Sequence, residues 1–95
     1  MAVIRFAREH RDGLKYSAIY IDNKLLPFDG DGIGHADLES GRAYNISWRI
    51  LGPLDASLVV VHLGHGGVIV DSAIREEDIV TPPDGRRSTF SFFEA

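Results

Sequence analysis

The fold is decided by the stretch Ala43-Tyr44-Asn45-Ile46-Ser47-Trp48-Arg49-Ile50-Leu51. Large apolar side chains alternate with polar ones along it, which is the period of a β-strand with one buried face and one wet face. Trp48 shares its face with Ile46 and Ile50, so we expect its ring in the core and not on a ligand-binding surface. The stretch therefore predicts a half-buried strand in an all-β protein.

The residues after this strand predict two more strands. A turn over Gly52-Pro53-Leu54-Asp55 leads into residues 57–63, which are apolar on both faces, as in a strand that is covered from two sides. The glycine-rich turn Gly64-His65-Gly66-Gly67 then returns the chain into a strand over residues 68–74. We therefore predict a three-stranded meander formed by residues 43–51, 57–63 and 68–74.

The N-terminal part of the chain has the same character. Strands are predicted over residues 3–8 and 16–21, and Asp22-Asn23 forms a tight turn into residues 24–28. Pro27 restricts this last run to the edge of a sheet or to the exit from it, because proline has no N–H to donate. A final strand is predicted over residues 87–93. The expected core consists of Ile4, Phe6, Ile46, Trp48, Ile50, Val59, Val61, Val68, Val70, Phe90 and Phe92.

About seven short, mostly antiparallel strands within residues 1–95 predict a single β-sandwich domain. The segment Leu38-Glu39-Ser40-Gly41-Arg42-Ala43-Tyr44-Asn45-Ile46-Ser47-Trp48-Arg49-Ile50-Leu51-Gly52-Pro53 resembles a pattern of small bacterial immunoglobulin-like domains. In that pattern a glycine and a tyrosine open a strand, a tryptophan lies in its middle, and a glycine turn follows. The resemblance implies an immunoglobulin-like β-sandwich. It implies no activity, because that family carries no single one.

Composition excludes several classes of protein. The chain has 95 residues, no cysteine and a formal net charge of −4. Disulfides, thiolate zinc sites and a thiol nucleophile are therefore excluded, and binding to a nucleic-acid backbone is not expected. The N-terminus does not have the pattern of a signal peptide, and the longest apolar run, over residues 58–61, is too short to cross a bilayer. We expect a cytoplasmic protein that binds neither nucleic acid nor membranes.

The longest stretch without strand character runs from residue 29 to residue 41 and is rich in glycine and acidic residues. Asp29, Asp31, Asp37 and Glu39 could supply a calcium site, because calcium prefers several oxygen ligands from a flexible loop. Their spacing differs from that of an EF-hand loop. The alternative is a solvated loop whose aspartates accept hydrogen bonds from nearby backbone N–H groups.

His62 and His65 form a second candidate site. Two imidazoles at the junction of a strand and a turn can hold zinc or another transition metal if His10, His35 or Asp71 completes the set. The groups of His62, His65 and Asp71 are also those that a small hydrolase or isomerase would use. The sequence contains no nucleophile-elbow pattern around a serine and no phosphate-binding glycine loop before a helix.

Tyr16 and Tyr20 share one face of their predicted strand, while Ile19 and Ile21 share the other. An exposed apolar face marks an interface, so Tyr16 and Tyr20, with His35, are candidates for a ligand or partner surface. The leading hypothesis is a non-enzymatic binding or assembly module without a cofactor, which self-associates or docks a protein partner. The alternatives are a calcium- or carbohydrate-binding β-sandwich that uses residues 29–39 and a small histidine-dependent enzyme.

Overall fold

Eight β-strands make up most of the chain in the computed structural model, which describes residues 2–64, 67–77 and 86–91. They are β1 (Ala2–Arg11), β2 (Tyr16–Ile21), β3 (Lys24–Leu25), β4 (Ile33–Leu38), β5 (Tyr44–Leu51), β6 (Ser57–Leu63), β7 (Val68–Ala73) and β8 (Arg86–Phe90). Within these residues, no helix is both long and apolar enough to cross a membrane.

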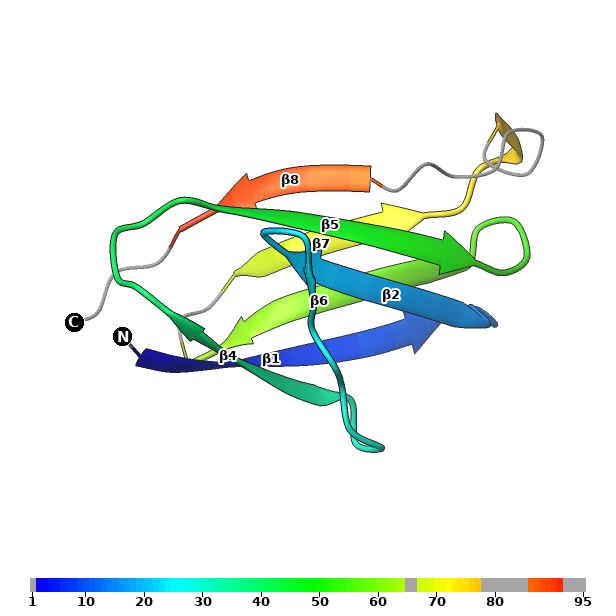
Figure 1. The fold of residues 1–95 in the computed structure, drawn as a ribbon. Coiled ribbons are helices and arrows are strands. Elements are labelled where there is room, and N and C mark those ends of the chain that lie inside the picture. The colour runs from blue at the N-terminus through cyan, green and yellow to red at the C-terminus, as the bar shows by residue number, and fades with distance from the viewer. Residues whose placement is uncertain (1, 65–66, 78–85, 92–95) are drawn as a thin grey trace.

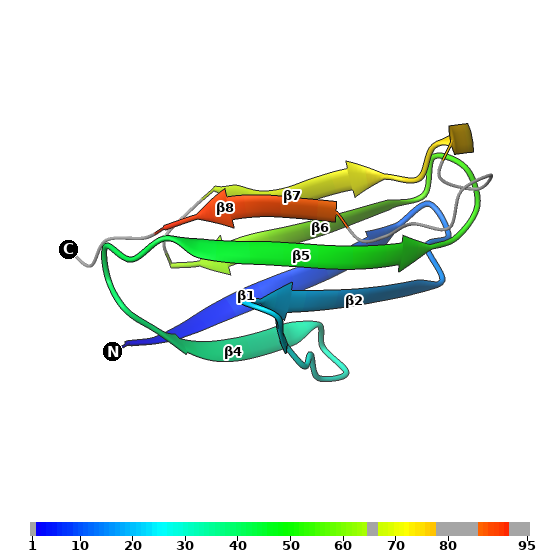
Figure 2. The ribbon, with the colours of Figure 1, turned by 45° about the horizontal axis from the view of Figure 1, so that its top comes forward.

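The strands form two sheets of four, which lie one above the other in Figure 1 and one in front of the other in Figure 2. The first, which we call the β1 sheet, has the order β4-β1-β6-β7, and the second, the β5 sheet, has the order β3-β2-β5-β8. Every pairing between neighbouring strands is antiparallel. The prediction of an all-β protein is therefore confirmed, and its two antiparallel sheets are compatible with a sandwich.

The strand with which the sequence analysis began lies inside the β5 sheet, between β2 and β8. Its burial alternates as predicted, with the even-numbered side chains Tyr44, Ile46, Trp48 and Ile50 buried. These side chains meet Ile4 and Phe6 of the β1 sheet in one apolar cluster between the layers. Further members of this core are Leu14, Ile19, Ile21, Leu26, Leu38, Ala56, Leu58, Val60, Val70 and Ile74.

The predicted three-stranded meander is wrong at its first connection. β5 pairs with β2 and β8, whereas β6 pairs with β1 and β7, so the chain crosses from one sheet to the other over residues 52–56. Of the three strands in the predicted meander, only β6 and β7 pair with each other, in antiparallel fashion. A short turn can link neighbours in one sheet or strands in two facing sheets, and local sequence does not distinguish these cases.

The two residues of β6 that were expected in the core, Val59 and Val61, lie on the other face of the strand from the one that meets the core. In the pairing with β1, His62 lies opposite the buried residue Phe6, so both side chains point toward the core. The even-numbered residues of β6, which are Leu58, Val60 and His62, are therefore the buried ones. Val59 and Val61 therefore face outward, where Val59 is buried and Val61 half-buried. Two further members of the predicted core differ: Val68 is 58% exposed and Phe90 is half-buried against the core, while Phe92 lies outside the described residues.

The stretch from residue 29 to residue 41, expected to lack strand structure, contains β4. This strand pairs with β1 along its whole length, and its inward positions are Gly34, Ala36 and Leu38. Glycine and alanine give little apolar signal, which explains why the sequence did not reveal the strand. Gly34 is required by close packing, since a Cβ atom there would lie 2.8 Å from the carbonyl oxygen of Pro27.

The tight turn predicted at Asp22-Asn23 is confirmed. Both residues have positive φ, 48° and 66°, and Ile21 pairs with Lys24 directly across the turn. Two consecutive left-handed residues are typical of a two-residue hairpin loop, and Asp and Asn tolerate this conformation better than most residues. The short strand that follows is the edge of the β5 sheet, as Pro27 indicated.

Candidate partner-binding face

The outward surface of the β5 sheet carries the two tyrosines that the sequence analysis selected. In the strand pairings Tyr16 lies opposite Leu51, and Tyr20 lies between Ser47 and Leu25, so these side chains share one face. We call this surface the tyrosine face. It consists of Tyr16, Ala18, Tyr20, Leu25, Asn45, Ser47, Arg49, Leu51, Arg87 and Thr89.

The apolar side chains of the tyrosine face are unusually open to solvent. Tyr16 is 51% exposed, Leu25 60% and Leu51 62%. Tyr20 is half-buried. Single exposed apolar residues are common on proteins, but here they form two facing pairs on adjacent strands. The face therefore offers two exposed aromatic–aliphatic pairs, Tyr16 with Leu51 and Tyr20 with Leu25, to a partner.

Arg49 lies in the middle of this surface. It is opposite Ala18, which stands between Tyr16 and Tyr20 on β2, and its neighbour along β5 on the same face is Leu51. Ala18 is only 6% exposed, as expected for a small residue surrounded by longer side chains. Arg49 itself is exposed and has no ion pair or hydrogen bond to another side chain among the described residues. The alternation along residues 43–51 predicts Arg49 on the wet side of its strand, but no sequence motif marks it as a site residue.

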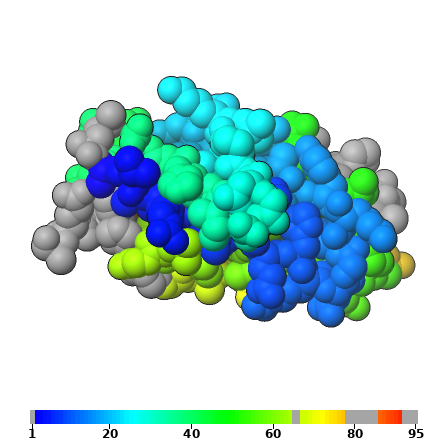
Figure 3. Space-filling view, turned by 90° about the horizontal axis from the view of Figure 1, so that it is seen from below, coloured from blue at the N-terminus to red at the C-terminus, as the bar shows by residue number. Residues whose placement is uncertain are grey.

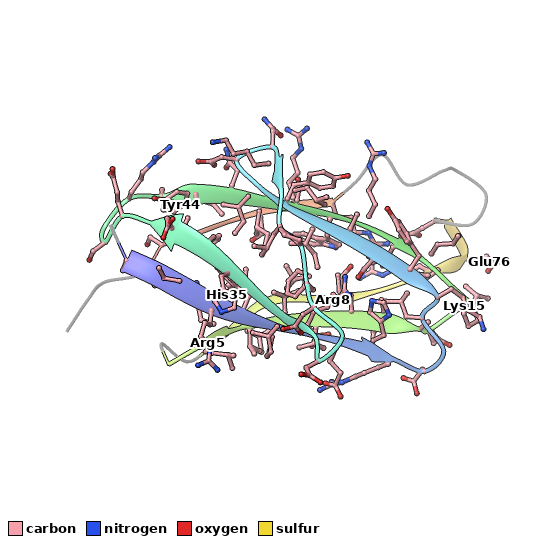
Figure 4. All side chains as sticks on the ribbon, turned by 60° about the horizontal axis from the view of Figure 1, so that its bottom comes forward. Arg5, Arg8, Lys15, His35, Tyr44 and Glu76 are labelled. Atoms are coloured by element: carbon pink, nitrogen blue, oxygen red, sulfur yellow. The ribbon has the colours of Figure 1, made fainter. Side chains whose placement is uncertain are left out.

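His35 does not join the tyrosines. It lies on β4 in the β1 sheet, opposite Arg5 of β1, and its side chain is exposed on the outward surface of that sheet. Figure 4 shows His35 and Arg5 on these neighbouring strands. The predicted partner surface is therefore divided between the two outer faces of the molecule.

The acidic residues of the predicted calcium site are spread along a turn and a strand. The Oδ1 atom of Asp29 accepts hydrogen bonds from the backbone N–H groups of Asp31 (2.8 Å) and Ile33 (3.0 Å), which is the capping role of the alternative interpretation. Asp37 lies on β4, and Glu39 follows that strand. In the part of the chain that the structure describes, no three His, Asp or Glu side chains gather closely enough to hold a metal ion. Calcium binding stays a prediction.

The backbone hydrogen bond from Ile33, followed by that from Asp31, lowers the pKa of Asp29 below its ordinary value of 3.8. A carboxyl group whose pKa is lower in the folded than in the unfolded protein stabilises the fold at pH values above its ordinary pKa. This stabilisation is lost as the pH falls through the pKa of the folded protein. We expect Asp29→Ala to destabilise the turn before β4. The free energy of unfolding should also depend less on pH in the acidic range. Urea unfolding at a series of acidic pH values measures both effects.

Asp29→Asn is the matched variant, because it retains an acceptor oxygen but removes the titration. It should keep most of the stability at neutral pH and show the same weaker dependence of the free energy of unfolding on acidic pH. Asp31→Ala is the control, since the Asp31 carboxylate has no hydrogen bond or ion pair among the described residues. An equal loss in the Asp29 and Asp31 alanine variants would contradict the capping role. Adding calcium to the same samples tests the calcium prediction.

The histidine candidates do not form one site. His62 is buried in the core, where its ring centroid lies 5.1 Å from those of both Phe6 and Phe90. Asp71 is exposed on β7, between the buried residues Val70 and Ser72, so its side chain leaves the opposite face of the same sheet. His65 lies outside the described residues. His62 and Asp71 therefore cannot act together on one substrate.

A histidine–serine pair that the sequence analysis did not select lies between the sheets. His10 Nε2 and Ser17 Oγ are 2.7 Å apart and join β1 to β2. Partial burial, and then the charge of Arg8, lowers the pKa of His10, which favours the neutral imidazole. Ser17 is only 7% exposed, so its hydroxyl is not presented to a substrate. The pair acts as a link between the two sheets.

The two edges along which the sheets face each other differ in how they are closed. At the β7–β8 edge, Arg86 of β8 donates hydrogen bonds to the Ser72 hydroxyl and to the carbonyl oxygen of Ala73 (2.8 Å), and these bonds link the two sheets. Along the other edge, a groove of about 530 Å³ opens between β3 and β4. Figure 3 shows this side, with β4 near the centre of the view. The groove is lined by Ile21, Asp22, Lys24, Leu25, Leu26, Pro27, His35, Ala36, Asp37, Leu38, Arg42 and Tyr44.

Charged residues at the rim of the groove already have partners within the chain. Arg42 forms an ion pair with Asp22 (3.1 Å) and stacks over the ring of Tyr44, 4.7 Å from its centroid. The second carboxylate oxygen of Asp22 accepts a hydrogen bond from the backbone N–H of Asn45 (2.9 Å). These contacts fix the β2–β3 turn against β5. The charged residues at the rim of the groove are therefore occupied within the fold, whereas Arg49 on the tyrosine face has no side-chain partner among the described residues.

No protein family, no curated protein and no solved structure matches the chain. The candidate site therefore rests on its own geometry.

Proposed function

We propose that this protein is a non-enzymatic binding module that docks a protein partner on the tyrosine face. The single observation behind this proposal is the pairing of Tyr16 with Leu51 and of Tyr20 with Leu25 on the exposed surface of the β5 sheet. Exposed aromatic and aliphatic side chains gain free energy when a partner removes them from water. Tyrosine is among the residues that contribute most to protein–protein binding, because it offers a large contact area with few rotatable bonds.

A rigid sheet is a suitable platform for such contacts. β2 and β5 lie in the interior of their sheet and pair with each other from Tyr16 opposite Leu51 to Ile21 opposite Ile46, and Tyr20 also pairs with Leu25 of β3. Little conformational entropy is then lost when the partner binds. Self-association through the same face is the second form of this proposal, and the experiment below distinguishes the two.

An immunoglobulin-like topology belongs to the same proposal. Two four-stranded antiparallel sheets, with the chain crossing between them several times, support it at the level of architecture. The fold class does not itself assign a partner.

Site-specific photocrosslinking in the cells that produce the protein tests the proposed function. A photoreactive phenylalanine derivative replaces Leu51 on the tyrosine face, and the same derivative replaces Val3 in a control protein. Val3 is a close match, because it is 64% exposed against 62% for Leu51 and lies on the outer surface of the other sheet. We expect a discrete crosslinked protein from position 51 and none from position 3.

Mass spectrometry of the crosslinked species identifies the occupant. A second copy of this chain indicates self-association, and a different polypeptide indicates a partner. Equal crosslinking from positions 51 and 3, or none from position 51 under conditions where the derivative is photoactive, would contradict the proposal.

A further inference from the structure

We infer that the partner presents an acidic polypeptide segment, with a carboxylate placed against Arg49 and aliphatic or aromatic side chains on either side of it. This inference rests on the proposed function and names the chemistry of the partner. Three observations carry it: the central position of Arg49, the absence of carboxylates among the described residues of the tyrosine face, and the aliphatic residues at its two ends.

The central position of Arg49 decides what a partner must supply. Arg49 lies opposite Ala18, with Tyr16 and Tyr20 on either side of that alanine. A partner that covers the two tyrosines therefore also covers the guanidinium group between them. Removing a charge from water is unfavourable unless an opposite charge or good acceptors replace the water. Because its charge persists at all physiological pH values, the guanidinium requires a counter-ion from the partner.

Among the described residues, the carboxylate nearest to the tyrosine face is that of Asp22 beside Asn45, and it already forms an ion pair with Arg42. The charged members of the face are Arg49 and Arg87, and Arg87 lies one strand further along the sheet, opposite Ser47. The protein as a whole carries a formal net charge of −4. A face with only positive groups on an acidic protein is a local feature, and it attracts and orients an acidic partner.

The aliphatic ends of the face and the charge of the protein together favour a polypeptide over a nucleic acid. Leu25 and Leu51 are the most exposed apolar residues of the face and offer contact area for apolar side chains, whereas bases would stack only on Tyr16 and Tyr20. Two arginines on a protein of net negative charge are also few for binding a phosphate backbone. An acidic segment that contains apolar residues matches both parts of the surface.

Selection from a random peptide library displayed on phage tests the inference, with the purified wild-type protein as bait. We expect the enriched peptides to contain Asp or Glu next to apolar residues. Arg49→Glu should lower the affinity for a selected acidic peptide about thirtyfold, because an interfacial charge pair is replaced by like charges. The Arg49→Glu bait should in turn enrich peptides that contain Lys or Arg.

Arg5→Glu is the matched control. Arg5 is exposed on the outer surface of the β1 sheet, so this variant makes the same change in net charge on the other side of the molecule. It should retain the wild-type affinity. Fluorescence of Trp48, the single tryptophan, reports whether each variant is folded.

Three outcomes would overturn the inference. If the enriched peptides depend on Tyr16 and Leu51 but carry no acidic residues and bind Arg49→Glu equally well, the inference fails and the proposed function stands. If no peptide depends on Tyr16 or Leu51, both fail. If the protein instead binds a uridine oligonucleotide and Arg49→Glu abolishes that binding, the ligand is a nucleic acid and not a polypeptide.

Discussion

Replacing Phe6 with alanine is expected to lower the free energy of unfolding by about 4 kcal/mol, the range found when a fully buried phenylalanine is truncated. Phe6 is completely buried on β1, in the interior of its sheet between β4 and β6. Its ring centroid lies 5.1 Å from that of His62 and 6.2 Å from that of Phe90, with the Phe90 ring edge-on. The truncation therefore removes contacts to both sheets at once.

The size of this loss matters because a small domain has little stability to spare, typically about 5 to 15 kcal/mol. The cavity left by the ring is enclosed by β-strands on two layers, which cannot close in without breaking their hydrogen bonds. Urea unfolding followed by Trp48 fluorescence measures the effect.

The control for Phe6→Ala is Val3→Ala on the same strand. Val3 is 64% exposed, so its truncation should change the free energy of unfolding by less than about 0.5 kcal/mol. Similar losses in the two variants would mean that the core does not lie between the two sheets as described.

Gly34→Ala is expected to destabilise the protein by about 2 kcal/mol, although alanine is normally a better residue than glycine in a strand. A Cβ atom at position 34 would lie 2.8 Å from the carbonyl oxygen of Pro27 and 3.2 Å from two ring atoms of Phe28. The first of these is a backbone atom that cannot rotate away. The Pro27–Phe28 segment, which pairs with Gly34 through an isolated bridge, would have to move off β4.

Gly30→Ala provides the comparison in the same part of the chain. No atom lies within 4 Å of a Cβ built at Gly30, and its φ is not left-handed. This variant should be neutral or stabilised by about 0.5 kcal/mol through the smaller entropy of the unfolded chain. Urea unfolding of both variants tests the contrast, and equal stabilities would contradict the close approach at Gly34.

Several parts of the site could be predicted from the sequence because they depend on local alternation alone. Tyr16 and Tyr20 were expected on one face of their strand, and the structure puts both on the outward side of the β5 sheet. Their partners on that face could not be predicted. Leu25 and Leu51 come from β3 and β5, and only the strand pairings bring them beside the tyrosines.

The same limit explains the errors. In β6 both faces are apolar, so alternation could not show which one faces the core, and the pairing of His62 with Phe6 decided it. In β4 the inward residues Gly34 and Ala36 are too small to produce an apolar pattern, and the strand forms because β1 pairs with it. His62 is of a residue type that often binds metals, but its side chain is buried in the core.

The sequence by itself determined that the protein is all-β, that residues 44–51 form a strand with Trp48 on its buried side, and that the run ending at Pro27 is an edge strand that leaves its sheet. These properties follow from the two-residue period of a strand and from the chemistry of proline, which act over a few residues. Tertiary structure alone decided which strands are neighbours, where the chain crosses between sheets, and that Arg49 lies between two tyrosines. Those properties depend on contacts between residues far apart in the chain, which no local pattern encodes.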